Sequence, residues 1–139
     1  MKSPFKILEH PSDLGIEAYG KSKQEVFQNA ALGLMSVVAG TSRIESRQER
    51  IVEIQALDRE NLMVRWLTEI LFLYDAEKFL TAEIKFETLT DTSLKAVLSG
   101  EQYNEAKHEL KLDVKAITYH QLSVEDHDSN WIARVFVDV

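Results

Sequence analysis

The chain has no cysteine, and only two prolines and five glycines occur among its 139 residues. Without cysteine it forms no disulfide, uses no thiol nucleophile and offers no thiolate to a metal ion. The glycines are dispersed, so there is neither a dinucleotide-binding loop nor a Walker phosphate loop. No Gly-x-Ser-x-Gly or His-Glu-x-x-His motif occurs either. These absences remove several common enzyme mechanisms.

The sequence also lacks long apolar runs and an excess of basic residues. No run approaches the roughly 18 residues of a membrane span, and no apolar signal core of about 7–15 residues follows Met1. The chain has 16 Lys and Arg residues and 23 Asp and Glu residues, which gives a net charge of −7. Because binding to phosphates needs basic residues, we expect no strong direct binding of nucleic acid. We expect a cytoplasmic protein with no membrane partner.

What the chain does have is enough apolar residues to form a core. Hydrophobic residues make up 45% of the sequence, which argues against global disorder. No linker, repeat or low-complexity segment interrupts the chain, and one domain takes about 100–200 residues. The sequence therefore predicts a single domain over residues 1–139.

Two segments carry strong helix signals. Ser22 and Glu25 form a capping-box pattern before apolar residues at helical spacing, which predicts a helix over residues 23–39 that stops near Gly40. Asp58 opens a second apolar segment. Its polar residues form one narrow stripe, so this helix is expected to be largely buried; they are Arg65, Thr68, Glu69 and Asp75.

The remaining segments alternate in polarity or are rich in β-branched and aromatic residues. Strands are expected over residues 5–8, 14–20, 52–56, 84–86, 94–98, 116–124 and 131–137. Turns are expected over residues 9–13, 90–92 and 126–130, and a polar loop over residues 100–108. Two helices followed by consecutive hairpins predict an α+β fold of two layers, a mostly antiparallel sheet with two main helices packed on one face.

The histidines show no catalytic pattern. They lie in predicted turns, loops or strands, and no two share the spacing of metal ligands; they are His10, His108, His120 and His127. We interpret each as a surface or strand residue with an ordinary partner. The acidic turn over residues 125–128 lacks the glycine and the distal glutamate of an EF-hand loop, so we interpret it as a solvated hairpin turn rather than a cation site.

Two aspartates break the expected pattern. Asp13 opens a strand directly before Leu14, and Asp138 ends a strand one residue before Val139. If the first and last strands are neighbours in the sheet, these carboxylates and the α-carboxylate of Val139 would meet. Crowded carboxylates repel one another unless a cation neutralises them. The alternative interpretation is a capping or turn Asp13 and a frayed terminal Asp138.

Lys115 lies in a segment that alternates in polarity. The alternation places Lys115, Ile117 and Tyr119 on one face of a strand, opposite Val114, Ala116, Thr118 and His120. A lysine at a strand end is most often a solvated charge that discourages aggregation. A functional Lys115 would have to contact an acidic partner or a phosphate.

Four segments together resemble the archease family. Glu-His-Pro-Ser-Asp-Leu-Gly-Ile over residues 9–16 is similar to the family's Glu-His-Thr-Ala-Asp-Ile-Gly, and Val-Lys-Ala-Ile-Thr-Tyr-His over residues 114–120 to its Val-Lys-Ala-Val-Thr-Tyr-His. The helix over residues 62–75 and the end over residues 131–139 resemble the family's Trp-containing helix and its Trp-x-Ala-x-Val-x-x-Asp-Ile terminus. Pro11 and Ser12 depart from the usual Thr-Ala, but Asp13 follows them as in the family.

The resemblance implies a non-catalytic activator of the RtcB-type RNA ligase, which joins RNA 2′,3′-cyclic-phosphate or 3′-phosphate ends to 5′-hydroxyl ends with GTP and a metal. Such an activator promotes ligase guanylylation and multiple turnover in tRNA splicing and RNA repair. By position, Asp13, Asp138 and Val139 would be the ligands of a divalent cation, expected to be calcium. Lys115 matches a lysine needed for activation.

Two other functions remain open. One is a chaperone-like modulator of a tRNA methyltransferase, a role also attached to the archease family. The other is a stand-alone metal-dependent hydrolase, which would need a general base such as His10 or His120 beside the cation.

Overall fold

The computed structural model describes residues 3–9 and 13–139 of the chain. Within them the order of elements is β1 (Phe5–Glu9), β2 (Leu14–Gly20), α1 (Lys23–Ala39), β3 (Gln48–Gln55), α2 (Arg59–Glu77), β4 (Phe79–Leu89), β5 (Ser93–Gln102), β6 (Ala116–Ile117), β7 (Ser123–His127) and β8 (Asn130–Asp138). In this described part no helix is long and apolar enough to cross a membrane.

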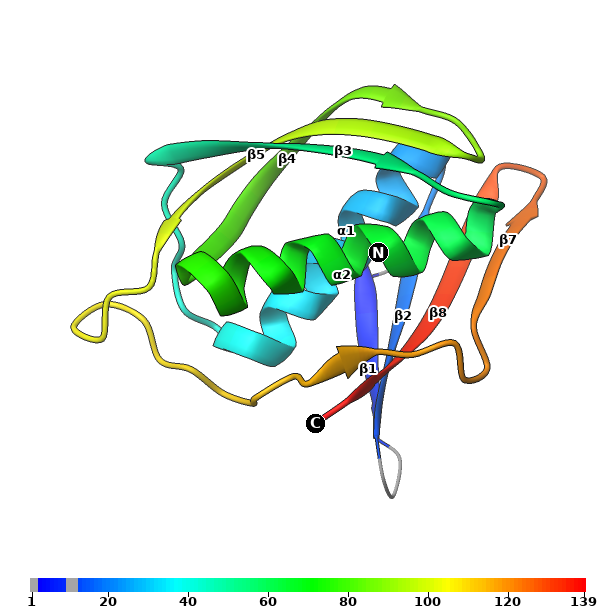
Figure 1. Ribbon diagram of the computed structural model, residues 1–139. Coiled ribbons are helices and arrows are strands. Elements are labelled where there is room, and N and C mark those ends of the chain that lie inside the picture. Colours follow the sequence, from blue (N-terminus) through cyan, green and yellow to red (C-terminus); the bar gives the residue numbers. More distant parts are fainter. Residues whose placement is uncertain (1–2, 10–12) are drawn as a thin grey trace.

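The strands divide between two antiparallel sheets. One has the order β1-β2-β8-β6, with β7 also paired to β8, and the other has the order β3-β5-β4. Both helices lie between these sheets, and each contacts strands of both (Figure 1). The expected α+β fold, with antiparallel strands and two main helices, is confirmed. The division of the strands into two sheets was not part of the prediction.

Local signals explain where α1 begins and ends. The Ser22 hydroxyl accepts a hydrogen bond from the amide of Glu25 at 3.1 Å, which satisfies one of the free donors of the first turn. At the other end Gly40 has φ 59°, a conformation that favours glycine, and its amide donates to the Ser36 carbonyl. The predicted bounds of this helix are confirmed.

Helix α2 is capped by Asp58, whose side chain accepts from the amide of Asn61 at 2.8 Å. Its exposed stripe contains Arg65, Thr68 and Asp75, as expected. Phe72 shares that stripe and is 55% exposed. Opposite the stripe, Trp66 is fully buried and its indole Nε1 donates to the Phe27 carbonyl of α1 at 2.9 Å, so the two helices are joined inside the core.

The hairpin of β4 and β5 is confirmed, with Ile84 opposite Leu98 and Phe86 opposite Ala96. It is longer than the sequence indicated. We expected a loop from residue 100, but β5 continues to Gln102 because residues 100–102 pair with the start of β4. Strand β3 likewise extends beyond the expected residues 52–56 and covers residues 48–55.

The expected strand over residues 116–124 was wrong. The chain pairs with β8 twice, first as β6 and then as β7, and it leaves the sheet between them. Ile117 lies opposite Val137 and Ser123 opposite Arg134, so the chain advances six residues along only three residues of β8. The following turn is also shorter than the expected residues 126–130.

Side-chain chemistry explains both departures. The Thr118 hydroxyl and amide donate to the Phe136 carbonyl at 2.9 and 3.0 Å, and Gln121 adopts φ 50°. These contacts hold the chain out of a regular strand. Between β7 and β8, Asp128 and Ser129 have φ 51° and 68°, the positive values of a two-residue hairpin turn.

Candidate functional site

One end of the larger sheet gathers the aspartates that the sequence singled out. Leu14 of β2 lies opposite Val137 of β8, so the next residues, Asp13 and Asp138, come to the same end of this strand pair. On one side β8 pairs with β2, the strand that follows Asp13, whereas β1 pairs with the other side of β2 and does not reach β8. The last strand therefore pairs with the second strand of the chain, the one that Asp13 precedes, and not with the first.

Lys115 reaches the same end from the other side of β8. Ala116 lies opposite Asp138, and the amide of Lys115 donates to the Asp138 carbonyl at 2.8 Å. The Lys115 side chain is exposed and forms no ion pair with any residue that the structure describes. The exposed ammonium group of Lys115 and the carboxylate of Asp138 thus come from main-chain segments that lie side by side.

Val139 follows Asp138 outside the strand and is 41% exposed, whereas Val137 is fully buried. The buried Val137 fixes the end of β8 in the core. The main-chain oxygens beyond Asp138 lie at the surface end of a well-anchored strand.

An aromatic ring packs beside the two aspartates. Strand alternation places Gly15 and Asp13 on one face of β2, and Phe136 and Asp138 on the same face of β8. The Phe136 ring lies over Gly15, where a Cβ atom would come within 2.9 Å of its Cε1. The His120 ring meets Phe136 edge-on at 5.7 Å. Glycine at position 15 thus lets this ring cover the sheet next to the acidic end.

The donors at this end have the chemistry of a hard-cation site. Two carboxylates and main-chain oxygens are ligands that calcium prefers, and calcium takes about 6–8 oxygens. Among the described residues, no group of three or more His, Cys, Asp or Glu side chains could hold a metal ion. A cation here would therefore depend on main-chain oxygens and on ligands from outside these side chains.

The structure places the histidines apart from one another. His127 contacts Glu125 at 2.8 Å in the acidic turn, and His120 lies on Phe136. His10 falls outside the described residues. His108 differs from the expected surface residue, because its side chain is fully buried. Neither the acidic turn nor a described histidine belongs to a three-ligand group.

His108 is part of a charged cluster that the sequence did not predict. Its Nδ1 accepts from the Asn104 amide at 3.0 Å, so Nε2 carries the proton and donates to Glu101 at 3.0 Å. Glu101 also accepts from Lys107 and from the Glu45 amide. Burial opposes ionisation of Glu101, but these hydrogen bonds together lower its pKa to about 2. No motif marked these residues, because they meet only through the fold.

A second charged group lies on the larger sheet. Arg134 of β8 and the Tyr19 hydroxyl both donate to Glu17 of β2. The Tyr19 hydrogen bond, with help from Arg134, lowers the pKa of Glu17. Burial and the bond to Glu17 raise the pKa of Tyr19 to about 12. Both groups therefore keep their ordinary charges at neutral pH and act as structural links.

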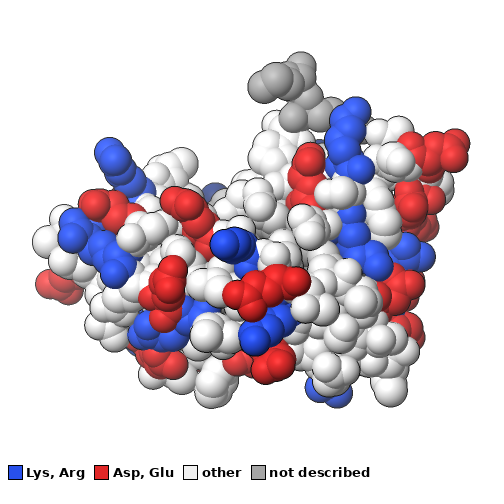
Figure 2. Space-filling view, turned by 90° about the horizontal axis from the view of Figure 1, so that it is seen from above, with Lys and Arg blue, Asp and Glu red and all other residues white. Residues whose placement is uncertain are grey.

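The molecular face seen from above carries charges of both signs. Figure 2 shows Lys and Arg interspersed with Asp and Glu over this face, with no large area of one sign. The Lys and Arg side chains on this face are flanked by Asp and Glu, so it offers no uniformly basic surface to a nucleic-acid backbone.

Comparison with known proteins identifies the fold and the family. A model of the archease protein family matches residues 5–139. The archease of Sulfolobus acidocaldarius is 38% identical over 97% of this chain and 98% of its own length, and that of Methanosarcina mazei is 38% identical over 97% and 95%.

Solved structures agree with this assignment. The solution structure of protein 1598 of Methanobacterium thermoautotrophicum superimposes with a TM-score of 0.82 at 37% identity, covering 98% of this chain and 99% of that one. The crystal structure of a Thermotoga maritima archease, described as a possible chaperone, gives a TM-score of 0.65 at 19% identity, over 100% and 98% of the two chains, and supports the fold alone. The chain belongs to the archease protein family.

Proposed function

We propose that this protein is a non-catalytic accessory protein that activates an RtcB-type RNA ligase in the cytoplasm, for tRNA splicing and RNA repair. The observation that carries the proposal is the strand register, which brings Asp13, Asp138 and Lys115 to one end of the larger sheet. Family membership supports it. The net charge of −7 suits a protein that contacts an enzyme rather than RNA itself.

In this proposal Asp13, Asp138 and a main-chain oxygen of Val139 hold a divalent cation, calcium by preference. Bound there, the cation supplies positive charge at an acidic end of the molecule. The chain's own contribution is rigidity, since Leu14 and Val137 pair in the sheet directly beside the two aspartates. Preorganised ligands lose less freedom on binding than mobile ones.

Lys115 contributes a second positive group from the position directly before β6. Its amide is tied to the Asp138 carbonyl, so the root of the side chain is fixed relative to the aspartate while the ammonium group stays exposed. We assign Lys115 to contact with an acidic or phosphate group of the ligase complex. A lysine suits this role because it is a flexible point charge.

The test is the rate of ligase guanylylation by GTP, with and without this protein. We expect the wild-type protein to raise the rate, and Asp13→Asn and Lys115→Ala each to lower that stimulation at least tenfold. Asp128→Asn is the matched control, because Asp128 is an exposed aspartate in the distant β7–β8 turn. Equal stimulation by wild type and Asp13→Asn would remove the cation from the proposal.

Val139 needs its own variant. Residues added after Val139 would convert its terminal carboxylate into a peptide carbonyl and displace it from the cation. We expect a short Gly-Ser extension to reduce the calcium affinity measured by titration calorimetry. An extension that leaves calcium affinity and stimulation unchanged would exclude the carboxylate of Val139 as a ligand.

A chaperone-like modulator of a tRNA methyltransferase is the second candidate. The description of the Thermotoga maritima protein as a possible chaperone favours it. It predicts a stoichiometric complex that suppresses methyltransferase aggregation or alters its site choice. A pull-down combined with an aggregation assay distinguishes this function from ligase activation.

A further inference from the structure

Strand β3 forms one edge of the smaller sheet, whose order is β3-β5-β4. Figure 1 shows β3 at one margin of the upper sheet. It pairs with β5 over residues 48–55 without a break in register, whereas β4, the other edge, contains register shifts at residues 81–83 and 86–88. Because such bulges bend a strand and hinder further pairing, β3 is the edge better suited to accept another strand.

Alternate residues of β3 direct their backbone hydrogen-bonding groups away from β5. The Ala56 amide donates to the Thr92 carbonyl at 2.8 Å, and these two residues continue the register of the pair, so the even-numbered residues of β3 are the ones bonded to β5. The N–H and C=O groups of the odd-numbered residues therefore point to the open edge. Ile51, Glu53 and Gln55 each present one donor and one acceptor there.

The solvent-facing side of β3 is acidic, with an apolar residue in the middle. Ile51 is 70% exposed, and Glu49 and Glu53 lie two residues from it on the same face. Neither glutamate forms an ion pair with a described residue. Lys95 lies opposite Glu53 on β5, but its ion pair is with Glu87 of β4, at 3.8 Å. The unpaired negative charge at this edge therefore favours basic residues in an incoming strand.

A second copy of the chain would bring like charges together at this edge. Two antiparallel copies share an outer face only in registers that place odd-numbered residues opposite odd-numbered residues. Alignment of Ile51 with its copy places each Glu49 opposite a Glu53, and a shift of two residues in either direction leaves glutamates as diagonal neighbours. Like charges on adjacent strands destabilise the pair, so the edge suits a strand of opposite charge rather than its own copy.

We infer that the open edge of β3 binds an extended segment of a partner protein as an added antiparallel strand, with basic, apolar and basic residues at alternate positions. The apolar residue lies opposite Ile51, and the basic residues lie opposite Glu49 and Glu53. The backbone of the segment bonds to the outward groups of β3, and about seven extended residues cover residues 49–55.

This edge is separate from the proposed ligase-activating site. Strand β3 belongs to the smaller sheet, whereas Asp13, Asp138 and Lys115 gather at one end of the larger sheet. Either proposal can therefore fail without the other.

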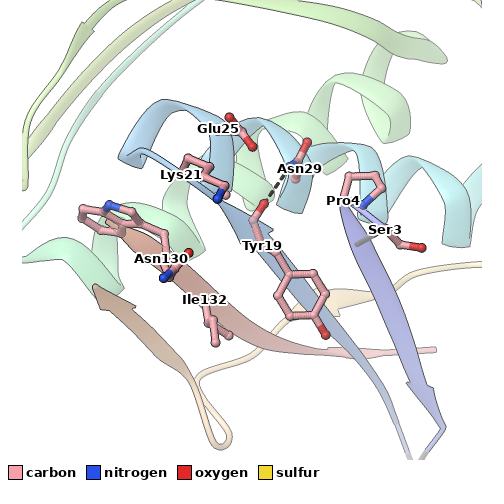
Figure 3. A pocket seen from close by; sticks show the side chains of 10 residues that line it. Ser3, Pro4, Tyr19, Lys21, Glu25, Asn29, Asn130 and Ile132 are labelled. Carbon is pink, nitrogen blue, oxygen red and sulfur yellow. Dashed lines mark hydrogen bonds between the residues drawn. The ribbon is translucent and has the colours of Figure 1, made fainter. Parts of the chain in front are cut away.

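A hollow beside α1, drawn in Figure 3, serves as the reference surface in the test. Lys21 and Glu25 line it with opposite charges, and the Asn29 amide donates to the Tyr19 carbonyl at 2.7 Å. Mixed charges select neither an acidic nor a basic segment. A basic strand bound at β3 should leave the residues of this hollow unaffected.

The probe is a labelled peptide, acetyl-Thr-Thr-Lys-Thr-Val-Thr-Lys-amide, whose binding is followed by fluorescence anisotropy at low ionic strength. We expect saturable binding. A peptide with Glu in place of both lysines should bind at least tenfold more weakly. The same loss is expected on N-methylation of the valine, because its N–H donates to the Ile51 carbonyl in the added strand.

Protein variants test the edge from the other side. Glu53→Lys reverses a charge at the edge, and Glu109→Lys reverses one on an exposed residue outside it. Glu53→Lys should weaken binding at least fivefold and Glu109→Lys less than twofold. Ile51→Pro removes an N–H that does not bond to β5, so this variant should fold but bind no peptide. Melting curves establish that the variants are folded.

Hydrogen exchange measured by NMR locates the added strand. We expect the peptide to slow exchange at the amides of Ile51, Glu53 and Gln55, and to leave Lys21 and Asn29 unchanged. No binding, equal binding of the N-methylated peptide, or equal losses in Glu53→Lys and Glu109→Lys would overturn the inference. A dimer that protects the same three amides without peptide would overturn it in favour of a second copy.

Discussion

At the residue scale, Gly15 has a role that only the fold reveals. The Phe136 ring occupies the space where a side chain at position 15 would begin, and the Cβ atom of Leu8 is 3.1 Å from the same point. Because Phe136 precedes Asp138 by two residues on the same strand face, the packing over Gly15 determines how the acidic end of the sheet is arranged.

Gly15→Ala is therefore expected to destabilise the fold by about 1–3 kcal/mol, the usual cost of overpacking. It should also weaken the proposed calcium binding, since Phe136 lies on the same strand face as both aspartates. Urea unfolding and calcium titration measure the two effects. The double variant Gly15→Ala/Phe136→Leu should regain part of the stability because leucine is smaller. Unchanged stability in Gly15→Ala would contradict this assignment.

The residues of the proposed site differ in how far the sequence reveals them. Asp13, Asp138 and Lys115 stood out because they interrupt apolar patterns or match a family motif. The Glu101 and His108 pair did not, because the two residues are seven positions apart in a largely polar segment and nothing local indicates burial. Residue pairs that form only when a loop folds back on the core cannot be predicted from local sequence patterns.

At the element scale, the helices could be predicted and the last strands only in part. Ser22, Asp58 and Gly40 act within their own turns, so the sequence carries the full signal. The departure from the expected strand after Ile117 depends on Thr118, whose hydroxyl binds a carbonyl of the distant β8. Threonine is common in strands, but the side-chain bond of Thr118 accompanies the end of β6.

The segment between β5 and β6 contains no helix and little regular pairing, so side chains must fasten it. Lys107 binds both Glu45 and Glu101, and His108 binds Glu101 from the buried side. Further along, the Lys111 amide donates to the Val38 carbonyl of α1. The segment that leads to Lys115 is thus held at several points.

Acid should loosen this segment through Glu101. Its pKa is about 2 in the folded protein and 4.5 ordinarily, so the ionised carboxylate stabilises the fold fully above about pH 4.5. That stabilisation is lost as the pH falls from 4.5 towards 2. Glu101→Gln should cost about 2 kcal/mol at pH 7, and the difference from wild type should shrink towards pH 2.5.

Urea unfolding at pH 7, 4 and 3 measures this dependence. Glu105→Gln is the control, because Glu105 is an exposed residue of the same segment without an ion pair to a described residue. A pH-independent gap between Glu101→Gln and wild type would show that charge is not what Glu101 contributes.

At the scale of the whole molecule, both sheets share the helices that lie between them. Trp66 is central to this arrangement, since it is fully buried and bonds to α1 from α2. Hydrophobic pattern alone indicated one sheet with helices on one face. The pattern could not assign the strands to two sheets, because the alternation of apolar and polar residues within a strand is the same in either sheet.

Trp66→Phe should lower the free energy of unfolding by about 2–4 kcal/mol, through a lost hydrogen bond and a cavity. Trp131→Phe should cost less than about 1.5 kcal/mol, since Trp131 is only half-buried. Chemical denaturation gives both values. Similar losses for the two variants would contradict the central position of Trp66.

The proposed activity places a rigid acidic end, flanked by Lys115, at the surface of this two-sheet framework. The most direct test counts the RNA molecules ligated per molecule of an RtcB-type ligase, with GTP and calcium, with and without this protein. We expect several products per ligase molecule with wild type, and about one with Asp138→Asn or without the protein. Equal product counts with and without the wild-type protein would contradict ligase activation.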